Sequence, residues 1–316
     1  MDSFKKTLTI IIIGLLVFNV FSFFYMRSVK TFSPVIPEIQ NITEMPSYAS
    51  ELQFFPNMRF NHNNLTFLIE DNCNMLEKEK IALAFSRIEQ ESNNLLTFHK
   101  TRENPDILVM CNSSQIINQA SKFFIAGEGG PERAIKSGVF YVIEKGTILL
   151  YSTFGGECAN YNVELHELLH VLGFTHSDNH LSVMYNISKC NQVITRDIID
   201  EIVRLYSIPA YPDVSVENIT ALKHGTYLDF EANVKNIGLN KAENIILGIS
   251  SKGQEIESFN LGTLEYGEGK ILAVENIKIP ISLLTLKELT FSLSIESSEL
   301  DYENNNITLV LNPDRQ

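Results

Sequence analysis

Residues 166–176 constrain the fold of this chain more than any other segment, because they read His-Glu-Leu-Leu-His-Val-Leu-Gly-Phe-Thr-His. His166 and His170 are four residues apart, and a helix places both imidazoles on one face, about one turn apart. Gly173 has the backbone freedom to end this helix, so we expect the chain to turn there and bring His176 back toward the first two histidines. The neighbouring stripe of the predicted helix is apolar and would be buried in a core: Leu165, Leu168, Leu169 and Leu172.

Three neutral imidazoles that converge form an open tetrahedral zinc site, with one position left for water. We therefore predict that His166, His170 and His176 bind one Zn²⁺ ion. Glu167 follows the first ligand and is placed to take a proton from this water, whose pKa zinc lowers toward ~7. The alternative is a helix that merely carries surface charges, and the fixed offsets of Gly173 and His176 argue against it.

The same segment resembles the metzincins, and among them the matrixins. Ser177 follows the third histidine, and Met184 comes eight residues after that histidine in the sequence Ser-Val-Met-Tyr. The resemblance implies a zinc metalloendopeptidase with three histidine ligands, with Glu167 as the general base and Met184 in the Met-turn under the metal. Met184 also fits an ordinary core methionine, because both interpretations bury its side chain.

The resemblance covers about residues 55–207 and implies a mixed sheet, an active-site helix and a C-terminal helix. Apolar residues at Ile81, Ala84, Phe85 and Ile88 have the spacing of a helix that packs on a core. Residues 106–110 form a short apolar run that predicts a strand, and Thr195 is a suitable N-cap for a closing helix that ends near Tyr206. Asn186 stands where matrixins usually have Pro, and neither a cysteine-switch propeptide nor the loops that bind further ions are recognisable.

The substrate of such a protease is expected to extend an exposed edge strand. Residues 139–144 are our candidate for that strand, with an ordinary sheet strand as the alternative. We expect residues 139–144 and 147–152 to form a hairpin around Lys145-Gly146. The glycine-rich residues 127–131 lack the pattern of a phosphate-binding loop, and we interpret them as a plain loop.

Residues 208–212 read Ile-Pro-Ala-Tyr-Pro and predict a linker, because two prolines stop a helix. Beyond it, apolar and polar residues alternate, as in residues 228–235 and 289–296. Short strands with this period predict an all-β sandwich over residues 213–316. The predicted fold class is therefore α+β for the metzincin-like domain, followed by the sandwich.

Two segments of the predicted sandwich resemble CARDB-type immunoglobulin-like modules, namely residues 230–238 and the closing residues 301–305. The resemblance implies adhesion or substrate positioning at a cell surface, through a ligand that the sequence does not identify. Asp301 and Glu303 would suit calcium, and a solvated turn is the alternative.

The N-terminus predicts export. Residues 8–25 are an uncharged, mostly apolar run, just long enough to cross a bilayer as a helix. We predict a cytoplasmic tail at residues 1–6, a transmembrane signal anchor at residues 7–25 and a proline-containing stalk at residues 26–54. The protein would then be membrane-anchored and face the extracellular side, and secretion after cleavage of a signal peptide is the alternative.

The four cysteines are Cys73, Cys111, Cys158 and Cys190, an even set that favours two disulfides in an exported protein. Four cysteines allow three pairings, and our guess is Cys73 with Cys111 and Cys158 with Cys190. Four buried free thiols are the alternative.

The formal net charge of −13 argues against a nucleic-acid partner, which requires a basic surface. We thus expect a membrane-anchored zinc endopeptidase that acts outside the cytoplasm on protein or peptide substrates. One rival is a surface adhesion or binding protein with a structural metal site, which has no need of Glu167. The other is a zinc hydrolase of cell-wall peptides, which the sequence does not distinguish from a protease.

Overall fold

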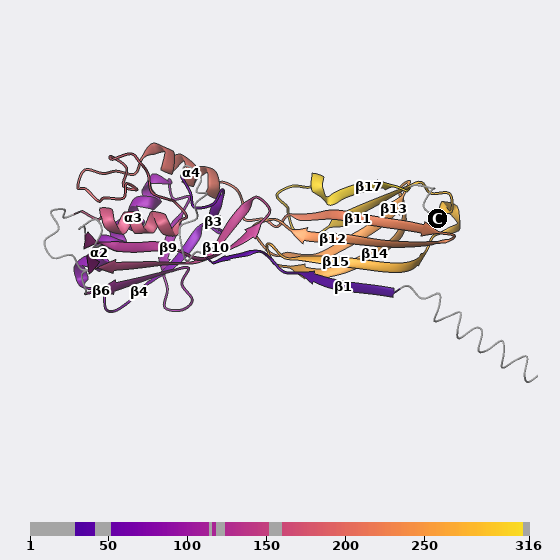
Figure 1. Cartoon of the computed structure of the whole chain (residues 1–316), viewed down its shortest axis with the longest axis horizontal. Coiled ribbons are helices and arrows are strands. Elements are labelled where there is room, and N and C mark those ends of the chain that lie inside the picture. The colour runs from indigo at the N-terminus through magenta and orange to yellow at the C-terminus, as the bar shows by residue number, and fades with distance from the viewer. Residues whose placement is uncertain (1–28, 42–51, 114–115, 118–123, 152–159, 312–316) are drawn as a thin grey trace, which may run out of the picture.

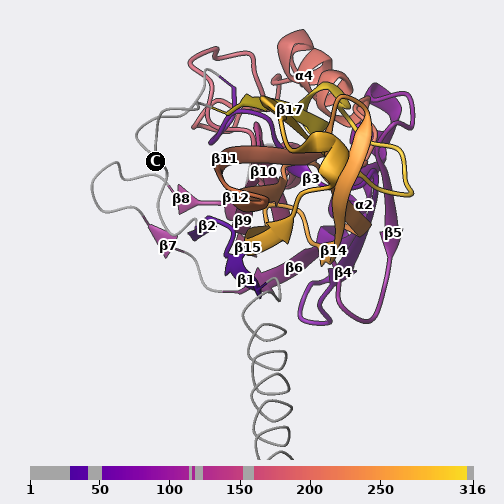
Figure 2. The ribbon, with the colours of Figure 1, turned by 90° about the vertical axis from the view of Figure 1, so that its right-hand side faces the viewer.

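Two lobes follow one another along the molecule in the computed structural model, which describes residues 29–41, 52–113, 116–117, 124–151 and 160–311 (Figure 1). One lobe contains a mixed sheet and three helices, and we call it the α+β domain. The other is a sandwich of two antiparallel sheets, and we call it the sandwich domain. The view along the long axis shows the sandwich sheets in front of the α+β domain (Figure 2). The predicted fold class is confirmed.

The α+β domain is built on a seven-stranded sheet with the order β2-β9-β10-β6-β4-β5, in which β3 also pairs with β10. Pairs of β10 with β3 and β6, and of β4 with β5 and β6, are parallel, whereas β9 is antiparallel to both neighbours. The strands are β2 (Ile39–Asn41), β3 (Met58–Phe60), β4 (Asn64–Ile69), β5 (Thr97–Lys100), β6 (Ile107–Asn112), β9 (Gly127–Ser137) and β10 (Phe140–Tyr151). A small separate ribbon pairs β7 (Ile116–Ile117) with β8 (Phe124–Ile125).

Helix α2 (Met75–Glu91) begins at a capping box, in which Asn74 accepts from the backbone of Glu77 and the Glu77 carboxylate accepts from the backbone of Asn74. Its predicted stripe, which includes Phe85, is buried against the sheet. The Phe85 ring lies 4.3 Å from Phe67 and 4.7 Å from Phe98, centroid to centroid. The helical period in the sequence therefore predicted both this helix and the face that it buries.

Helix α4 (Arg196–Tyr206) closes the α+β domain and is held at its C-terminal end by Arg59 of β3. Arg59 has no exposed surface, and its guanidinium donates to the carbonyl oxygens of Leu205 and Ile208. It also lies 4.6 Å from the centre of the Tyr206 ring. A buried cation thus satisfies carbonyl groups that a helix C-terminus leaves without partners.

The sandwich domain consists of one sheet with the order β1-β15-β12-β11 and a second with the order β14-β13-β16-β17. Its strands are β1 (Val29–Val35), β11 (Val214–His224), β12 (Tyr227–Asn236), β13 (Ala242–Ser251), β14 (Gln254–Leu264), β15 (Gly269–Lys278), β16 (Glu288–Ser294) and β17 (Asn306–Val310), with two 3₁₀ turns, η1 (Ile281–Leu283) and η2 (Glu303–Asn305). Alternate residues of β12 and β16 are buried between the sheets, as the period of two predicted.

Residues 29–41 differ from the predicted stalk and contribute a strand to each domain. β1 pairs along its whole length with β15, and β2 pairs with residues 133–135 of β9. We call residues 29–41 the strap, and Figure 1 shows β1 along the sandwich sheet. The stalk prediction was wrong here because the partners of both strands lie far away in the sequence, where local composition carries no signal.

The hairpin predicted around Lys145-Gly146 was also wrong, since β10 is one continuous strand through these residues. The hairpin turns instead at Gly138, between β9 and β10, and its tip contacts the sandwich domain. The Ser137 hydroxyl donates to the carbonyl oxygen of Gly238 at 2.6 Å. Phe140 and Val142 are buried in one cluster with Leu239, so an apolar contact joins the domains.

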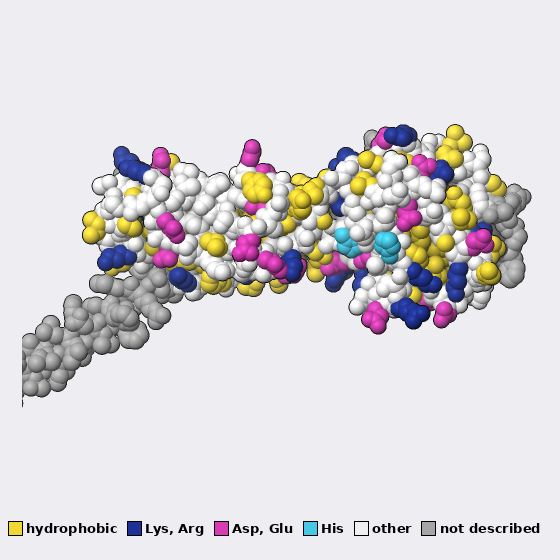
Figure 3. Space-filling model, turned by 180° about the vertical axis from the view of Figure 1, so that it is seen from behind, with side chains coloured by type: hydrophobic (Ala, Val, Ile, Leu, Met, Phe, Trp, Pro, Cys, Tyr) yellow, Lys and Arg dark blue, Asp and Glu magenta, His cyan; other side chains and the backbone are white. Residues whose placement is uncertain are grey.

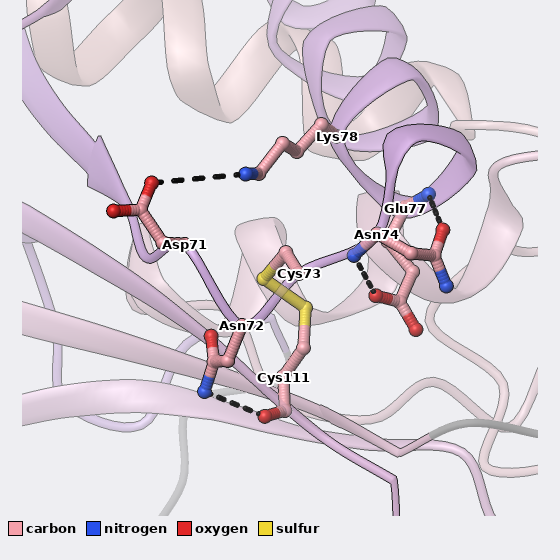
Figure 4. The surroundings of a disulfide bond; sticks show 7 residues. All are labelled: Asp71, Asn72, Cys73, Asn74, Glu77, Lys78 and Cys111. Carbon is pink, nitrogen blue, oxygen red and sulfur yellow. Dashed lines mark hydrogen bonds and ion pairs between the residues drawn. A yellow bond between two sulfur atoms is a disulfide. The ribbon is translucent and has the colours of Figure 1, made fainter.

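Cys73 and Cys111 form the disulfide that we predicted (Figure 4). It joins the start of α2 to β6, and Asn72 beside it donates to the carbonyl oxygen of Cys111. Cys190 is disulfide-bonded as well. Its predicted partner, Cys158, lies outside the described residues.

The described residues contain no helix that is long and apolar enough to cross a membrane. The predicted tail and anchor at residues 1–25 lie outside the described residues, as does the part of the predicted stalk at residues 42–51.

Candidate active site

Helix α3 (Asn162–Val171) carries the first two histidines and packs against β9 at very short range. A Cβ atom on Gly129 would lie 2.4 Å from the carbonyl oxygen of Glu167, and one on Gly127 would lie 2.8 Å from the Glu167 Cγ atom. Only glycine lets the backbones approach so closely. The glycine-rich residues that we interpreted as a loop are therefore the strand against which the active-site helix rests.

The chain turns after α3 as predicted. Gly173 has a φ of +96°, and its amide donates to the carbonyl oxygen of His170. This turn brings His176 to the helix, where its Nε2 atom lies 3.2 Å from the Nε2 atom of His170. The Nε2 atoms of His170 and His166 are 2.9 Å apart. The three predicted ligands thus meet at one point, and within the described chain they are the three histidines whose ring nitrogens cluster in this way.

Backbone carbonyls determine which nitrogens of these rings carry protons. The Nδ1 atom of His166 lies 2.7 Å from the carbonyl oxygen of Val183, and the Nδ1 atom of His170 lies 2.8 Å from that of Phe174. A carbonyl oxygen only accepts, so both Nδ1 atoms carry hydrogen and both Nε2 atoms present lone pairs.

Lone pairs that face one another at about 3 Å repel unless a cation lies between them. Tetrahedral zinc with bonds of ~2.0–2.1 Å would hold its nitrogen ligands roughly 3.3 Å apart. The observed spacing and the donor set of three imidazoles therefore fit a zinc ion.

Burial keeps these imidazoles neutral. It lowers the pKa of His166 to about 4 and that of His170 to about 3, and it also lowers the pKa of His176, the most exposed of the three. His170 packs against the ring of Phe54, with 5.7 Å between the ring centroids. Neutral imidazole is the form that binds a metal, so the site is ready for one near pH 7.

Glu167 is 6% exposed and lies on the same helix, directly after His166. Burial, reinforced by the negative charge of Glu128, raises the pKa of Glu167 to about 8. The backbone N–H of Gly129 donates to its carboxylate and works in the opposite direction. A carboxyl group with a pKa near neutral both accepts and returns a proton readily, as a general base must.

Met184 is 1% exposed and belongs to the same compact turn as the His166 partner Val183. The amide of Ser177 donates to the carbonyl oxygen of Met184 at 2.9 Å, which ties this turn to the third histidine. His180, between them, makes an edge-on contact with the Tyr185 ring, with 4.3 Å between the ring centroids, and is not part of the histidine cluster. On the face shown in Figure 3, histidine side chains reach the surface of the α+β domain.

The candidate edge strand at residues 139–144 was wrong, because β10 has neighbours on both sides. The outer strand beside α3 is β9. Glycine content hid it, since a strand with Gly127, Gly129 and Gly130 lacks the alternation by which strands are recognised.

Comparisons with known proteins agree with this geometry. Residues 59–207 match the family model of the matrixins, which supports a zinc metalloprotease, and the predicted resemblance is confirmed for these residues. None of the curated proteins matches the chain. Among solved structures, the chain is similar to a CARDB domain from Pyrococcus furiosus whose crystal structure is described as a complex with di-metal ions, at 19% identity over 31% of this chain and 84% of that one, with a TM-score of 0.25. It is also similar to the solution NMR structure of that domain, at 20% identity over 31% and 91%, with a TM-score of 0.25.

Proposed function

We propose, with a matrixin-like metalloprotease domain at residues 59–207 as the premise, that this protein is a zinc endopeptidase whose ligands are His166, His170 and His176 and whose general base is Glu167. The observation that carries the proposal is the convergence of three imidazole Nε2 atoms beside a buried glutamate. A purely structural metal site would not need a carboxyl group there.

The three imidazoles would hold the metal, and backbone carbonyl groups orient two of the rings. The carbonyl oxygens of Val183 and Phe174 fix two rings through their Nδ1 hydrogens, which leaves the Nε2 atoms free to bind. Bound zinc supplies Lewis-acid polarisation of the scissile carbonyl group and lowers the pKa of water.

Glu167 moves the protons. As a carboxylate it accepts a proton from the attacking water on one of its Oε atoms. As a carboxylic acid it then donates that proton to the leaving amine nitrogen when the peptide bond breaks. The raised pKa supports both steps, because neither form is strongly disfavoured near neutral pH.

The substrate would bind as an additional strand on the outer edge of β9, over residues 127–131. This part of β9 lies against Glu167, and among the described residues no strand pairs with its outer edge. An extended peptide placed there passes the histidine cluster, so backbone hydrogen bonds rather than side-chain pockets would supply much of the affinity.

The active domain would face the outside of the cell, either anchored by residues 7–25 or secreted. The Cys73–Cys111 disulfide supports export, because such bonds persist in oxidising compartments. Added protease that digests the protein on intact cells would support the anchored form, and activity in the medium alone would support the secreted form.

The test compares the full chain with two isosteric variants on the same helix. Glu167→Gln removes the base, and Glu164→Gln is the matched control because Glu164 is also buried on α3, 8% exposed. Against a peptide library, we expect Glu167→Gln to lower kcat/KM by about 10²–10⁴-fold. Glu164→Gln should retain activity, a chelator should abolish it, and metal analysis should give one zinc per chain.

Stoichiometric zinc without cleavage of any peptide, or cleavage that Glu167→Gln retains, would contradict the proposal. Cleavage confined to cross-linked cell-wall peptides would instead identify the protein as a zinc hydrolase of cell-wall peptides.

A further inference from the structure

We infer that β2 closes one end of the substrate-binding edge, so that this protease pairs with only a few substrate residues on the N-terminal side of the scissile bond. The inference rests on the proposed function and on substrate binding to β9. It identifies the strap as part of the specificity machinery, although the strap lies far from the histidine motif in the sequence.

The strand β9 has two parts with different neighbours. We call residues 127–131 the cleft half, because Gly127 and Gly129 lie against Glu167. We call residues 133–137 the covered half, because β2 pairs with residues 133–135 on the outer edge. Both halves belong to one edge of one sheet, so a strand that extends along the cleft half meets the end of β2.

An irregularity separates the two halves. Arg133 pairs with Lys145 of β10 and Pro131 pairs with Gly146, so Glu132 between them has no partner in this register. An extra residue of this kind bends a strand and changes the direction in which its backbone groups point. The irregularity lies directly before Arg133, the residue at which the pairing with β2 ends on the side of the cleft half.

The direction of β2 shows which end of the substrate is affected. β2 runs antiparallel to β9 and advances toward the cleft, with Ile39 opposite Ile135 and Asn41 opposite Arg133. A substrate paired antiparallel to the cleft half runs in the same direction as β2, so the N-terminal side of the substrate approaches Asn41. The C-terminal side leaves toward Gly127, where no described strand pairs with the outer edge.

The length of the cleft half sets the number of residues. Glu167 contacts β9 at Gly129, so the scissile bond would lie near this residue. At about 3.3 Å per residue, the stretch from Gly129 to Glu132 offers room for roughly four substrate residues before β2 is reached. A longer N-terminal part gains no further backbone pairing.

The test uses two peptide series that share one cleavable core, one extended at its N-terminus and the other at its C-terminus. The amide of Lys136 donates to the carbonyl oxygen of Glu38, and hydrogen-bonded pairs alternate along an antiparallel ladder, so the backbone of Gln40 is expected to bond that of Ala134. Gln40→Pro removes this donor and frees the end of β2. Gln40→Ala keeps the donor and is the matched control.

For the wild-type full chain, kcat/KM should rise over about four N-terminal residues and then stay constant within about 2-fold. In Gln40→Pro, the fifth and sixth residues should add a further ~2–10-fold, the effect of one or two new hydrogen bonds. Gln40→Ala should match the wild type, and the C-terminal series should be the same for all three proteins.

Two results would overturn the inference and leave the proposed function intact: a wild-type gain that continues past six residues, or an unchanged plateau in Gln40→Pro. Failure of the zinc-loaded wild type to cleave any member of either series would overturn the proposed function, and the inference with it.

Discussion

The two domains bury polar groups in different places. Buried polar and charged residues of the α+β domain lie throughout its interior, and among them are Arg59 and Glu167. In the sandwich domain, as far as the structure describes it, all but Ser251 lie near the end that meets the α+β domain: Asp213, Ser215, Asn236, Glu299 and Asn305. Between the sheets, the sandwich has an apolar core of the ordinary alternating kind.

The different positions of the buried polar groups indicate what they stabilise in each domain. Burying a polar group costs free energy unless hydrogen bonds offset it, so such groups remain where the position of a neighbour must be fixed. In the α+β domain they fix a helix end and the buried carboxyl group of Glu167. In the sandwich they fix segments at the end that meets the α+β domain.

Loss of Arg59 should have the largest effect on stability and should destabilise the α+β domain alone. Arg59→Met leaves the carbonyl oxygens of Leu205 and Ile208 without a donor, and we expect the free energy of unfolding to fall by about 4 kcal/mol. Urea unfolding followed by circular dichroism should show the transition of the α+β domain shifted and that of the sandwich domain unchanged. Arg87→Met, at a surface ion pair with Glu91, is the control and should cost less than ~1 kcal/mol. Equal losses would refute this role.

Loss of Asn236 should weaken the sandwich at its junction. Asn236 has no exposed surface; its Oδ1 accepts from the amides of Asp213 and Gly238, and its Nδ2 donates to the carbonyl oxygens of Asn240 and Leu264. Asn236→Ala should cost about 3 kcal/mol in the sandwich transition, because four groups lose their partner. The exposed Asn260 is the control position, and Asn260→Ala should cost less than ~1 kcal/mol. An unshifted sandwich transition in Asn236→Ala would contradict the prediction.

When metal is removed, acid should lower the free energy of unfolding of the α+β domain by about 2 kcal/mol relative to that of the sandwich domain. The pKa values of His166 and His170 fall from 6.5 to about 4 and about 3 on folding, so their contribution is present above pH 6.5 and is lost as the pH falls. The pKa of Glu167 rises from 4.5 to about 8, so its contribution is present below pH 4.5 and is lost as the pH rises through 8. The metal-free α+β domain should therefore be most stable between about pH 6 and 7.

In the sandwich, burial raises the pKa values of Asp213 and Glu299, so these groups do not weaken it in acid. Unfolding of chelator-treated protein from pH 4.5 to 8 would measure both transitions. Glu167→Gln should remove the loss on the alkaline side and deepen the loss on the acid side, because the neutral carboxyl group no longer offsets the two histidines. A sandwich that weakens in parallel with the α+β domain below pH 6.5 would contradict this prediction.

Local patterns predicted what local physics determines. The stripe that includes Phe85 predicted α2, the motif with Gly173 predicted the turn that gathers the histidines, and alternation predicted the sandwich strands. These features depend on residues a few positions apart. The convergence of three imidazoles at the candidate site could therefore be predicted from the sequence.

The prediction failed where distant contacts determine the structure. Lys145-Gly146 suggested a turn, but Gly146 is required because a Cβ atom there would lie 2.4 Å from the Val171 Cγ1 atom. Gly127 and Gly129 suggested a loop for the same reason. Arg59 gave no signal, since its partners are carbonyl groups at the far end of the domain sequence. In each case the deciding neighbour belongs to another element.

The strap also affects the order in which the two domains can fold during synthesis. β1 leaves the ribosome before any other described strand, yet Val29 waits for Glu275, its partner in β15. At ~5–20 residues per second, that interval lasts on the order of tens of seconds. The α+β domain can collect all its strands during this interval, whereas the sandwich sheet cannot add its outermost strand until synthesis is nearly complete. A newly made chain can thus complete the α+β domain first, and β1 joins the sandwich sheet only after β15 has been made.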